Sequence, residues 1–233
     1  MSPDAAGAYS GVDNLEVMEQ ALNYNAFLQE LVTAWARPSD EILDFGAGTG
    51  VLAVPLAAAG YQVRCVEPDA GLRARLQASG LDAHVAIEEI SPDSLDLVYT
   101  VNVLEHIADD LAAVAALRRR LKPGGLLVAY VPAFPTLHTS MDAKVGHLRR
   151  YRRAGLAEVL HRAGLIVEQI AYQDGLGFVA TLLFKWFGND KGAINLQALI
   201  AYDRCAFPLS RRLDRLTGRW FGKNLLAVAR RHD

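Results

Sequence analysis

Short apolar runs alternate with helical patterns along the first two thirds of the chain. Apolar and β-branched runs predict strands at Glu41–Phe45, Gln62–Val66, Ala83–Ile87, Leu95–Thr100, Leu126–Val131 and Ile166–Tyr172. Apolar residues at helical spacing between these runs predict helices at Leu52–Ala59, Ala70–Ser79, Asp109–Leu121 and Arg153–Ala163. Strands and helices that alternate at roughly 20-residue intervals are typical of a doubly wound α/β fold with a mostly parallel sheet.

Three segments fall outside this alternation. Leu15–Trp35 has the pattern of a helix before the first strand, and Pro132–Tyr151 is a long connection rich in His, Pro and Arg. Asp174–Gly218 is mostly helical in pattern and precedes a last strand-like run, Lys223–Ala229. We therefore expect a single domain over residues 1–233 with a Rossmann-like seven-stranded sheet, a helical cap (1–36), a lid loop (132–151) and a helical insertion (174–218). Because ligands bind beyond the carboxyl ends of such strands, the lid and the insertion should border the site.

Composition supports one folded domain and excludes disorder. The chain has 233 residues, of which 52% are hydrophobic and 21% charged. Its two cysteines, Cys65 and Cys205, form no CxxC pair and no metal-ligand spacing, so we expect reduced thiols in a cytoplasmic protein. The N-terminus lacks a signal-peptide pattern, and the apolar stretch Leu176–Phe187 is shorter than the ~20 residues that span a bilayer. We therefore expect a soluble protein.

Charge is divided unevenly along the chain, although the formal net charge is only −2. Residues 1–117 contain 18 acidic and 4 basic side chains, whereas residues 118–233 contain 8 acidic and 20 basic ones. The basic second half indicates either a surface that faces an anionic partner or simply a group of solvated cationic helices.

The glycine-rich turn after the first predicted strand, in EILDFGAGTG, indicates a nucleotide site. Gly46 and Gly48 fit the dinucleotide fingerprint G-x-G-x-x-G/A, but Val51 stands at its third small position. Asp44 lies two residues before the first glycine, where its charge would repel a pyrophosphate and attract a sulfonium or ammonium group. No G-K-[ST] follows, which excludes a P-loop. The turn therefore favours a cationic nucleoside ligand.

D-x-G-x-G-x-G is the pattern of class I S-adenosylmethionine-dependent methyltransferases, and the chain resembles this family (methyltransferase type 11/12-like) along most of its length. Three further stretches carry the resemblance in the family's order: QVRCVEPD, LDLVYTVNVLEHIADD and LKPGGLLVAYVP. The resemblance implies that S-adenosyl-L-methionine is the cofactor and S-adenosyl-L-homocysteine the product. It further implies that Glu67 accepts hydrogen bonds from the ribose hydroxyls and that Ile87 and Glu88 flank the adenine.

The expected cofactor site therefore gathers residues from the cap and from the ends of the strands. Its members are Tyr24, Asp44, Phe45, Gly46, Ala47, Gly48, Gly50, Glu67, Pro68, Ile87, Glu88, Asn102, Val103 and His106. Tyr24, with Tyr9 and Asn23, belongs to a segment that in this family often folds over the cofactor; ordinary helix packing is the alternative. We expect His106 to be a wall residue rather than a catalyst, and we expect no metal.

The stretch after the predicted fifth strand carries the candidates for catalysis. It resembles a subgroup of these methyltransferases with a G-H-x-R-R-Y segment, here Gly146–Tyr151. His147 offers an imidazole that titrates near neutrality and is the first candidate for a general base or substrate ligand, with His138 the second. Arg149, Arg150 and Tyr151 are expected to order the lid or touch the substrate, since guanidinium groups suit carboxylate or phosphate.

Motifs of several methyltransferase subclasses are missing from the chain. TVNV stands where [DN]-P-P-[YFW] would indicate methylation of an adenine amino group or a glutamine amide. No cysteine lies in a loop near the site, which argues against the covalent route to pyrimidine C5. The remaining expectation is methyl transfer to O or N of a bulky or anionic small-molecule acceptor, such as a secondary metabolite or a sugar- or lipid-linked compound.

Two alternatives and several partner questions stay open at this point. An RNA or protein methyltransferase would use the basic second half, but no recognisable RNA-binding module is present, so nucleic acid is not the expected partner. A domain that binds the cofactor without turnover is the other alternative. The mixture of aromatics and arginine in the insertion fits an acceptor pocket, a dimer contact or peripheral contact with a membrane surface. The expected state is a monomer or a homodimer.

Overall fold

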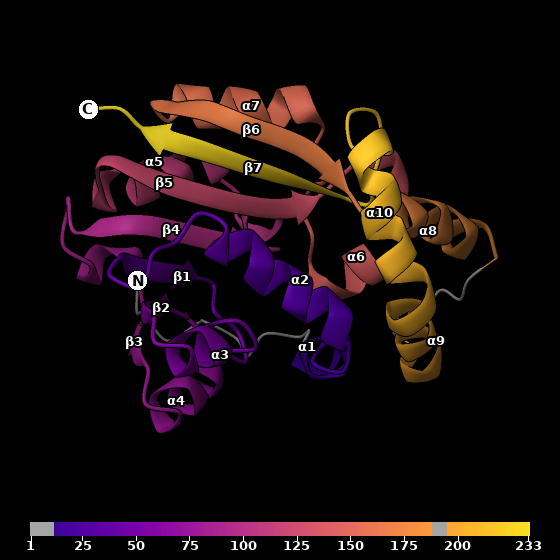
Figure 1. Ribbon diagram of the computed structural model, residues 1–233, viewed down its shortest axis with the longest axis horizontal. Helices are drawn as coiled ribbons and strands as arrows, with labels where there is room; N and C mark the ends of the chain where they lie inside the picture. The colour runs from indigo at the N-terminus through magenta and orange to yellow at the C-terminus, as the bar shows by residue number, and fades with distance from the viewer. Residues whose placement is uncertain (1–11, 188–194) are drawn as a thin grey trace, which may run out of the picture.

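A seven-stranded sheet forms the centre of the computed structural model, which describes residues 12–187 and 195–233 (Figure 1). The strand order is β3-β2-β1-β4-β5-β7-β6, and β7 alone runs antiparallel to its neighbours. The strands are β1 (Glu41–Phe45), β2 (Gln62–Val66), β3 (Asp82–His84), β4 (Leu95–Val101), β5 (Leu121–Pro132), β6 (Leu165–Gln173) and β7 (Asn224–Arg231). The predicted Rossmann-like, mostly parallel sheet is confirmed.

Helices cover both faces of the sheet (Figure 1). The α-helices are α1 (Val12–Met18), α2 (Leu22–Thr33), α3 (Ala53–Ala58), α4 (Ala70–Ala78), α5 (Asp110–Arg120), α6 (Ser140–Val145), α7 (Arg153–Arg162), α8 (Gly175–Phe187), α9 (Leu196–Ala201) and α10 (Phe207–Thr217). Short 3₁₀ turns are η1 (Ile87–Glu89), η2 (Leu104–His106) and η3 (Pro135–Leu137), and η4 (Tyr202–Ala206) is a π-helical turn.

Alternation along each strand builds two cores, one on each face of the sheet. Leu43 of β1 joins the core that contains Val114 of α5 and Leu156 of α7. Its neighbour Ile42 joins the opposite core with Phe27 of α2. Asp44 therefore points to the same face as Ile42, toward the N-terminal helices rather than toward α5 and α7.

The prediction of one continuous helix over Leu15–Trp35 was wrong, because the chain turns between α1 and α2. The side-chain amide of Asn25 donates hydrogen bonds to the carbonyl oxygens of Met18 (3.0 Å) and Glu19 (3.3 Å). These bonds satisfy carbonyls that a helix leaves unpaired at its end.

The predicted third strand, Ala83–Ile87, was also too long. β3 ends at His84, which pairs with Val66 at the end of β2. Beyond that point no strand remains to pair with, and Ile87 begins η1 instead.

The lid and the insertion meet at one end of the molecule, where Figure 1 shows α6, α8, α9 and α10 gathered. Phe134 of the lid loop contacts Phe178 of α8, with ring centroids 5.3 Å apart. From η4, Asp203 accepts hydrogen bonds from the backbone N–H groups of Asn23 (3.0 Å) and Tyr24 (2.8 Å). The insertion is therefore tied both to the lid and to the start of α2.

Residues 1–11 of the expected cap, including Tyr9, and residues 188–194 of the expected insertion lie outside the described residues. Within the described part of the chain, no helix combines the length and the apolar character needed to cross a bilayer.

Candidate active site

A cavity of about 420 Å³ lies where β1, β2 and β4 end, beneath α1 and α2. This volume falls in the range of cavities that hold small ligands and cofactors, ~300–1,000 Å³. Ten of the expected cofactor residues line it: Tyr24, Asp44, Gly46, Ala47, Gly48, Glu67, Pro68, Asn102, Val103 and His106. The structure thus brings together residues that are up to 82 positions apart in the sequence.

Two glycines of the turn are required for different packing reasons. Gly46 has φ +83°, and a Cβ there would lie 2.4 Å from Cγ2 of Val103 in the cavity wall. Gly50 also has φ +83°, but its Cβ would lie 2.7 Å from Cδ2 of Leu76 in α4. Gly46 therefore lets the loop approach the cavity wall at Val103, whereas Gly50 lets it pack against Leu76 of α4, which does not line the cavity.

Glu67 joins the glycine turn to the following segment. Its Oε2 accepts a hydrogen bond from the Gly48 N–H (2.8 Å), and its Oε1 accepts one from the Asp69 N–H (2.9 Å). Burial raises the pKa of this carboxyl group, and the two backbone N–H groups partly offset the effect. Each oxygen keeps one lone pair with which it could accept a hydroxyl hydrogen of a ligand.

Asp44 supplies a second acid to the same cavity. The Tyr99 hydroxyl donates a hydrogen bond to its Oδ2 at 2.8 Å. Burial raises the pKa of Asp44 to about 7, although the Tyr99 hydrogen bond opposes the shift. A cationic ligand beside Asp44 would favour its ionised form. The cavity therefore fits a ligand with a positive charge and vicinal hydroxyls better than it fits a pyrophosphate.

Four expected cofactor residues do not line this cavity. The Phe45 side chain packs against the core on the opposite face of the sheet, and Gly50 faces Leu76 as described. Ile87 is buried, and its carbonyl oxygen accepts a hydrogen bond from Arg120 Nε (3.0 Å), while Glu88 is exposed to solvent. The early end of β3 explains why Ile87 and Glu88 do not line the cavity, because η1 begins there instead of a longer strand.

Other lining residues were not predicted from the sequence. They are Leu15, Met18, Asn25 and Leu28 from α1 and α2, together with Thr49, Val51, Leu52, Asp69, Leu72 and Val101. The amphipathic pattern of the first segment indicated only that one face is buried. Asp69, two residues after Glu67 in the same quoted stretch, was not singled out.

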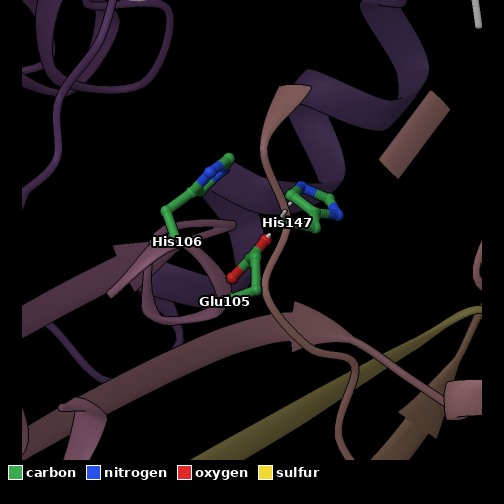
Figure 2. A group of neighbouring side chains, drawn as sticks. All are labelled: Glu105, His106 and His147. Carbon is green, nitrogen blue, oxygen red and sulfur yellow. Dashed lines mark ion pairs between the residues drawn. The ribbon is translucent and has the colours of Figure 1, made fainter. Parts of the chain in front are cut away.

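Next to the cavity wall, three titratable side chains meet (Figure 2). The rings of His106 and His147 lie 4.7 Å apart, and His147 Nε2 lies 3.7 Å from Glu105 Oε1. Burial, with a smaller effect of the His147 charge, lowers the pKa of His106 to about 4, so His106 is neutral at pH 7. Burial raises the pKa of the fully enclosed Glu105 to about 8. Neither carboxylate oxygen of Glu105 has a hydrogen-bond partner among the described residues.

Asp142 of α6 fixes His147 from the other side. The Nδ1 atom of His147 lies 2.7 Å from Asp142 Oδ1, and Arg150 contacts both oxygens of the same carboxylate (2.8 and 3.0 Å). Burial raises the pKa of Asp142, but the hydrogen bonds from His147 and Arg150 outweigh it and hold the pKa well below its usual range. An ionised carboxylate only accepts hydrogen bonds, so Nδ1 carries the proton of this contact and Nε2 takes no part in it.

The other expected catalytic residues contact the protein itself. The His138 Nε2 atom lies 3.5 Å from the His147 carbonyl oxygen. Arg149 pairs with Asp110 (2.8 Å), and the Tyr151 hydroxyl donates a hydrogen bond to the same carboxylate (2.7 Å). Burial and Asp110 raise the pKa of Tyr151. These contacts hold the lid against α5, and His147 is the lid residue that reaches the cavity wall, through His106.

The side chains of Figure 2 also form a potential cation site. The ligand atoms of Glu105, His106 and His147 all lie within 4.8 Å of one another. Two imidazoles and a carboxylate are a donor set that zinc and other divalent metals use in proteins, and Asp142 would orient His147 as a second-shell carboxylate does. The sequence analysis expected no metal and did not foresee this cluster.

The fold, the glycine turn and the acidic residues together define a Rossmann-like enzyme domain that binds a nucleoside cofactor at the carboxyl ends of its strands. Comparison with known proteins narrows this class. Residues 14–170 match the family described as a methyltransferase domain, and the chain belongs to that family.

Similar proteins include named methyltransferases. A ubiquinone biosynthesis O-methyltransferase of Cereibacter sphaeroides (strain ATCC 17025 / ATH 2.4.3) is 41% identical over 98 residues, which are 37% of this chain and 39% of that protein. The methyltransferase in a complex with the Trm112 activator of Haloferax volcanii covers 100% of both chains with a TM-score of 0.69 and 16% identity. Geranyl diphosphate C-methyltransferase of Streptomyces coelicolor A3(2), in complex with S-adenosyl-L-homocysteine, covers 88% of this chain and 77% of that chain, with a TM-score of 0.62 and 14% identity. The chain thus aligns with about two fifths of the length of the curated relative.

The chain is therefore a member of a methyltransferase family, as the sequence resemblance predicted. Solved neighbours that share the fold were determined with S-adenosyl-L-homocysteine or S-adenosyl-L-methionine bound.

Proposed function

We propose that this enzyme transfers the methyl group of S-adenosylmethionine to a hydroxyl oxygen of a small-molecule acceptor, with His147 as the general base. The observation that carries the proposal is the Asp142–His147 pair, which engages Nδ1 and leaves Nε2 outside that contact, on a ring packed against the cavity-wall residue His106. An amine is methylated as its free base, whereas a hydroxyl group must lose a proton during the transfer. An oriented imidazole with a free lone pair therefore favours O over N as the acceptor atom.

The cofactor contacts follow from the two acids of the cavity. S-Adenosylmethionine, when bound, supplies an electrophilic methyl group on a positively charged sulfur. Glu67 keeps one lone pair on each oxygen for the ribose hydroxyls, and Asp44 attracts the cationic end of the cofactor. Tyr24 and Asn25 of α2 line the opposite wall and exclude water from the reacting atoms.

In the proposed step, the cofactor would supply its methyl group to the acceptor oxygen and leave as S-adenosyl-L-homocysteine, so that the carbon–oxygen bond forms as the carbon–sulfur bond breaks. His147 Nε2 takes the hydroxyl proton, and Asp142 stabilises the resulting imidazolium through Nδ1. Glu105, enclosed beside Nε2, adds negative charge once it ionises. Arg149 and Tyr151 serve as positioning residues, because both bind Asp110 and hold the lid segment in place.

The name of the partly aligned relatives supports a hydroxylated acceptor related to lipid-linked or secondary metabolism. We propose a bulky or anionic acceptor, an enzyme that works in the cytoplasm, and a monomer or homodimer without a nucleic-acid partner. The alternative is methylation of RNA or protein, and the one feature that favours it is the basic second half of the chain.

In a direct test, the purified enzyme is incubated with labelled S-adenosylmethionine and one of three kinds of acceptor. These are substituted phenols and catechols, matched aromatic amines, and total RNA or protein. We expect label in methyl ethers, formed by wild type and by Leu148→Ala but much more slowly by His147→Ala. Leu148 is the exposed neighbour of His147 and serves as the matched control. Label in amines, RNA or protein instead of ethers would contradict the proposal.

A further inference from the structure

The insertion carries a row of exposed apolar side chains on α10. Leu209, Leu213 and Leu216 are exposed, and Trp220 follows in the turn after the helix. At 3.6 residues per turn, positions separated by four and three residues fall on one face of a helix, so the three leucines share a face of α10 and Trp220 lies just beyond its end. Leu216 and Trp220 are 71% and 69% exposed, so this face has no cover among the described residues.

Three arginines flank this row on one side. Arg212, Arg215 and Arg219 have no hydrogen bond or ion pair with any described residue. The nearby acid Asp214 is already engaged, because its carboxylate accepts the backbone N–H groups of Asp174 (2.7 Å) and Gly175 (2.9 Å). The surface formed by Leu209, Leu213, Leu216, Trp220, Arg212, Arg215 and Arg219, here called the α10 surface, therefore has uncompensated positive charge beside apolar area.

A second row has the same spacing on the neighbouring helix. Val179, Leu183 and Trp186 of α8 are exposed, with Trp186 68% exposed. α8 packs against α10: the Leu176 N–H donates a hydrogen bond to Ser210 Oγ (2.9 Å). Figure 1 shows both helices at the same end of the molecule. Exposed leucine and tryptophan next to arginine is the composition of helices that lie in a membrane interface.

A lipid surface fits the α10 surface better than a second copy of the chain does. In a two-fold interface the same patch faces itself, so the arginines of both copies would be brought together and desolvated without acidic partners. Anionic lipid headgroups instead supply the missing counter-charge while the acyl region takes up the leucine and tryptophan side chains.

The insertion that carries the α10 surface contacts both the lid loop and the start of α2. Lys185 of α8 donates a hydrogen bond to the Thr136 carbonyl oxygen of the lid loop (2.6 Å). Asp203 of η4 accepts the N–H of Tyr24, whose side chain lines the cavity. A bilayer bound at α10 would therefore lie close to the segments that admit the acceptor.

We infer that the α10 surface docks the enzyme on an anionic membrane, from which it takes an amphiphilic acceptor. Membrane docking is inferred from the residues of the α10 surface alone, whereas the membrane origin of the acceptor rests on the proposed O-methyltransferase function.

The test measures cosedimentation of the full chain with phosphatidylcholine vesicles, with and without phosphatidylglycerol, together with light scattering in solution. We expect binding that needs phosphatidylglycerol and weakens with salt. Leu216→Glu/Trp220→Glu should abolish it. Neutralising Arg212, Arg215 and Arg219 to Gln should weaken it by roughly fivefold for each arginine. Ile166→Glu, at an exposed apolar position on β6, is the matched control and should bind like wild type.

Two results would overturn the inference. One is sedimentation that does not depend on phosphatidylglycerol or on Leu216 and Trp220. The other is a wild-type dimer that Leu216→Glu/Trp220→Glu converts to a monomer, which would assign the surface to a second copy. Thermal unfolding of each variant excludes a folding defect. Because vesicle binding is measured without an acceptor, a loss of O-methylation with intact binding would count against the proposed function and not against docking.

Discussion

The imidazole of His147 and the carboxylate of Asp142 are 2.7 Å apart, and Arg150 holds that carboxylate in a bidentate contact. The pair lies on the lid, yet His147 reaches the cavity wall by contact with the ring of His106. This contact joins the segment after β5 to the wall of the cavity.

Removing the imidazole should affect turnover and not cofactor binding. His147→Ala is expected to lower kcat by about 10²–10⁴-fold, the usual contribution of a general base, while the Kd for S-adenosylmethionine stays within about twofold. Calorimetry and steady-state kinetics measure the two quantities, with Leu148→Ala as the control. Equal losses in affinity and turnover would show that His147 supports the cavity and does not take the proton.

Asp142→Asn should keep the geometry of the contact with His147, but it should no longer fix which ring nitrogen of His147 carries the proton. An amide can donate as well as accept, so Nδ1 no longer has to carry the proton and part of the enzyme presents Nε2–H to the acceptor. We expect kcat to fall at least tenfold. We also expect some loss of stability, because Arg150 is left buried without its counter-charge, a change that costs about 3–5 kcal/mol when a buried ion pair is broken. Unchanged kcat in the folded variant would contradict the role given to Asp142.

Cofactor affinity should depend on pH through Asp44. Its pKa is raised to about 7 in the free protein, and a bound cation lowers it, so binding releases a proton near neutrality. Affinity for S-adenosylmethionine should therefore fall as pH drops below about 7. Calorimetry in buffers of different ionisation enthalpy measures the released proton.

Two variants of this site provide the comparison. Asp44→Asn should remove the pH dependence together with much of the affinity. Tyr99→Phe should move the midpoint upward, since it removes the hydrogen bond that favours the ionised carboxylate. Affinity that is flat between pH 5.5 and 8, values on either side of about 7, would show that Asp44 does not face the cation.

Gly46→Ala separates backbone strain from steric conflict when it is compared with Gly60→Ala. Both glycines have positive φ (+83° and +92°), but a Cβ at Gly60 has no atom within 4 Å, whereas one at Gly46 would lie 2.4 Å from Val103. Gly60→Ala should cost about 1–2 kcal/mol of unfolding free energy and leave cofactor binding intact. Gly46→Ala should cost more and weaken binding severely; equal behaviour of the two variants would remove the special role of Gly46.

Metal dependence distinguishes the two possible uses of the cluster in Figure 2. If His147 is a base, extensive treatment with a chelator should leave kcat unchanged, and added Zn²⁺ should inhibit by occupying Nε2. Loss of turnover on chelation and its recovery with a divalent cation would instead make Glu105, His106 and His147 metal ligands.

The sequence predicted the sheet, and ten of the residues that it proposed for the cofactor line one cavity, because both depend on local patterns. Alternating apolar runs located the strands. Asp44, the glycines and Glu67 belong to one strand–turn–helix–strand unit, in which the carboxyl ends of the two parallel strands lie side by side. The same reasoning failed at Ile87 and Glu88, because the end of β3 depends on where β2 stops offering a partner. No pattern within either strand marks that position.

The lid chemistry was predicted less completely. His147 stood out by its residue type, but Asp142 and Glu105 did not, since carboxylates five residues before and 42 residues before His147 show no local spacing rule. Their roles come from tertiary packing, which buries Glu105 and closes the Thr139–Asp142 capping box around the pair. Likewise, the sequence located the insertion but not which of its apolar residues would remain exposed.

The most direct test of the account measures methyl transfer by wild type and His147→Ala across phenols of decreasing pKa. If His147 takes the proton, the ratio of the two rates should be large for weakly acidic phenols. It should approach one when the phenol ionises without help near pH 7. A ratio that stays constant across the series would contradict proton transfer to His147 and leave the residue a role in structure or binding alone.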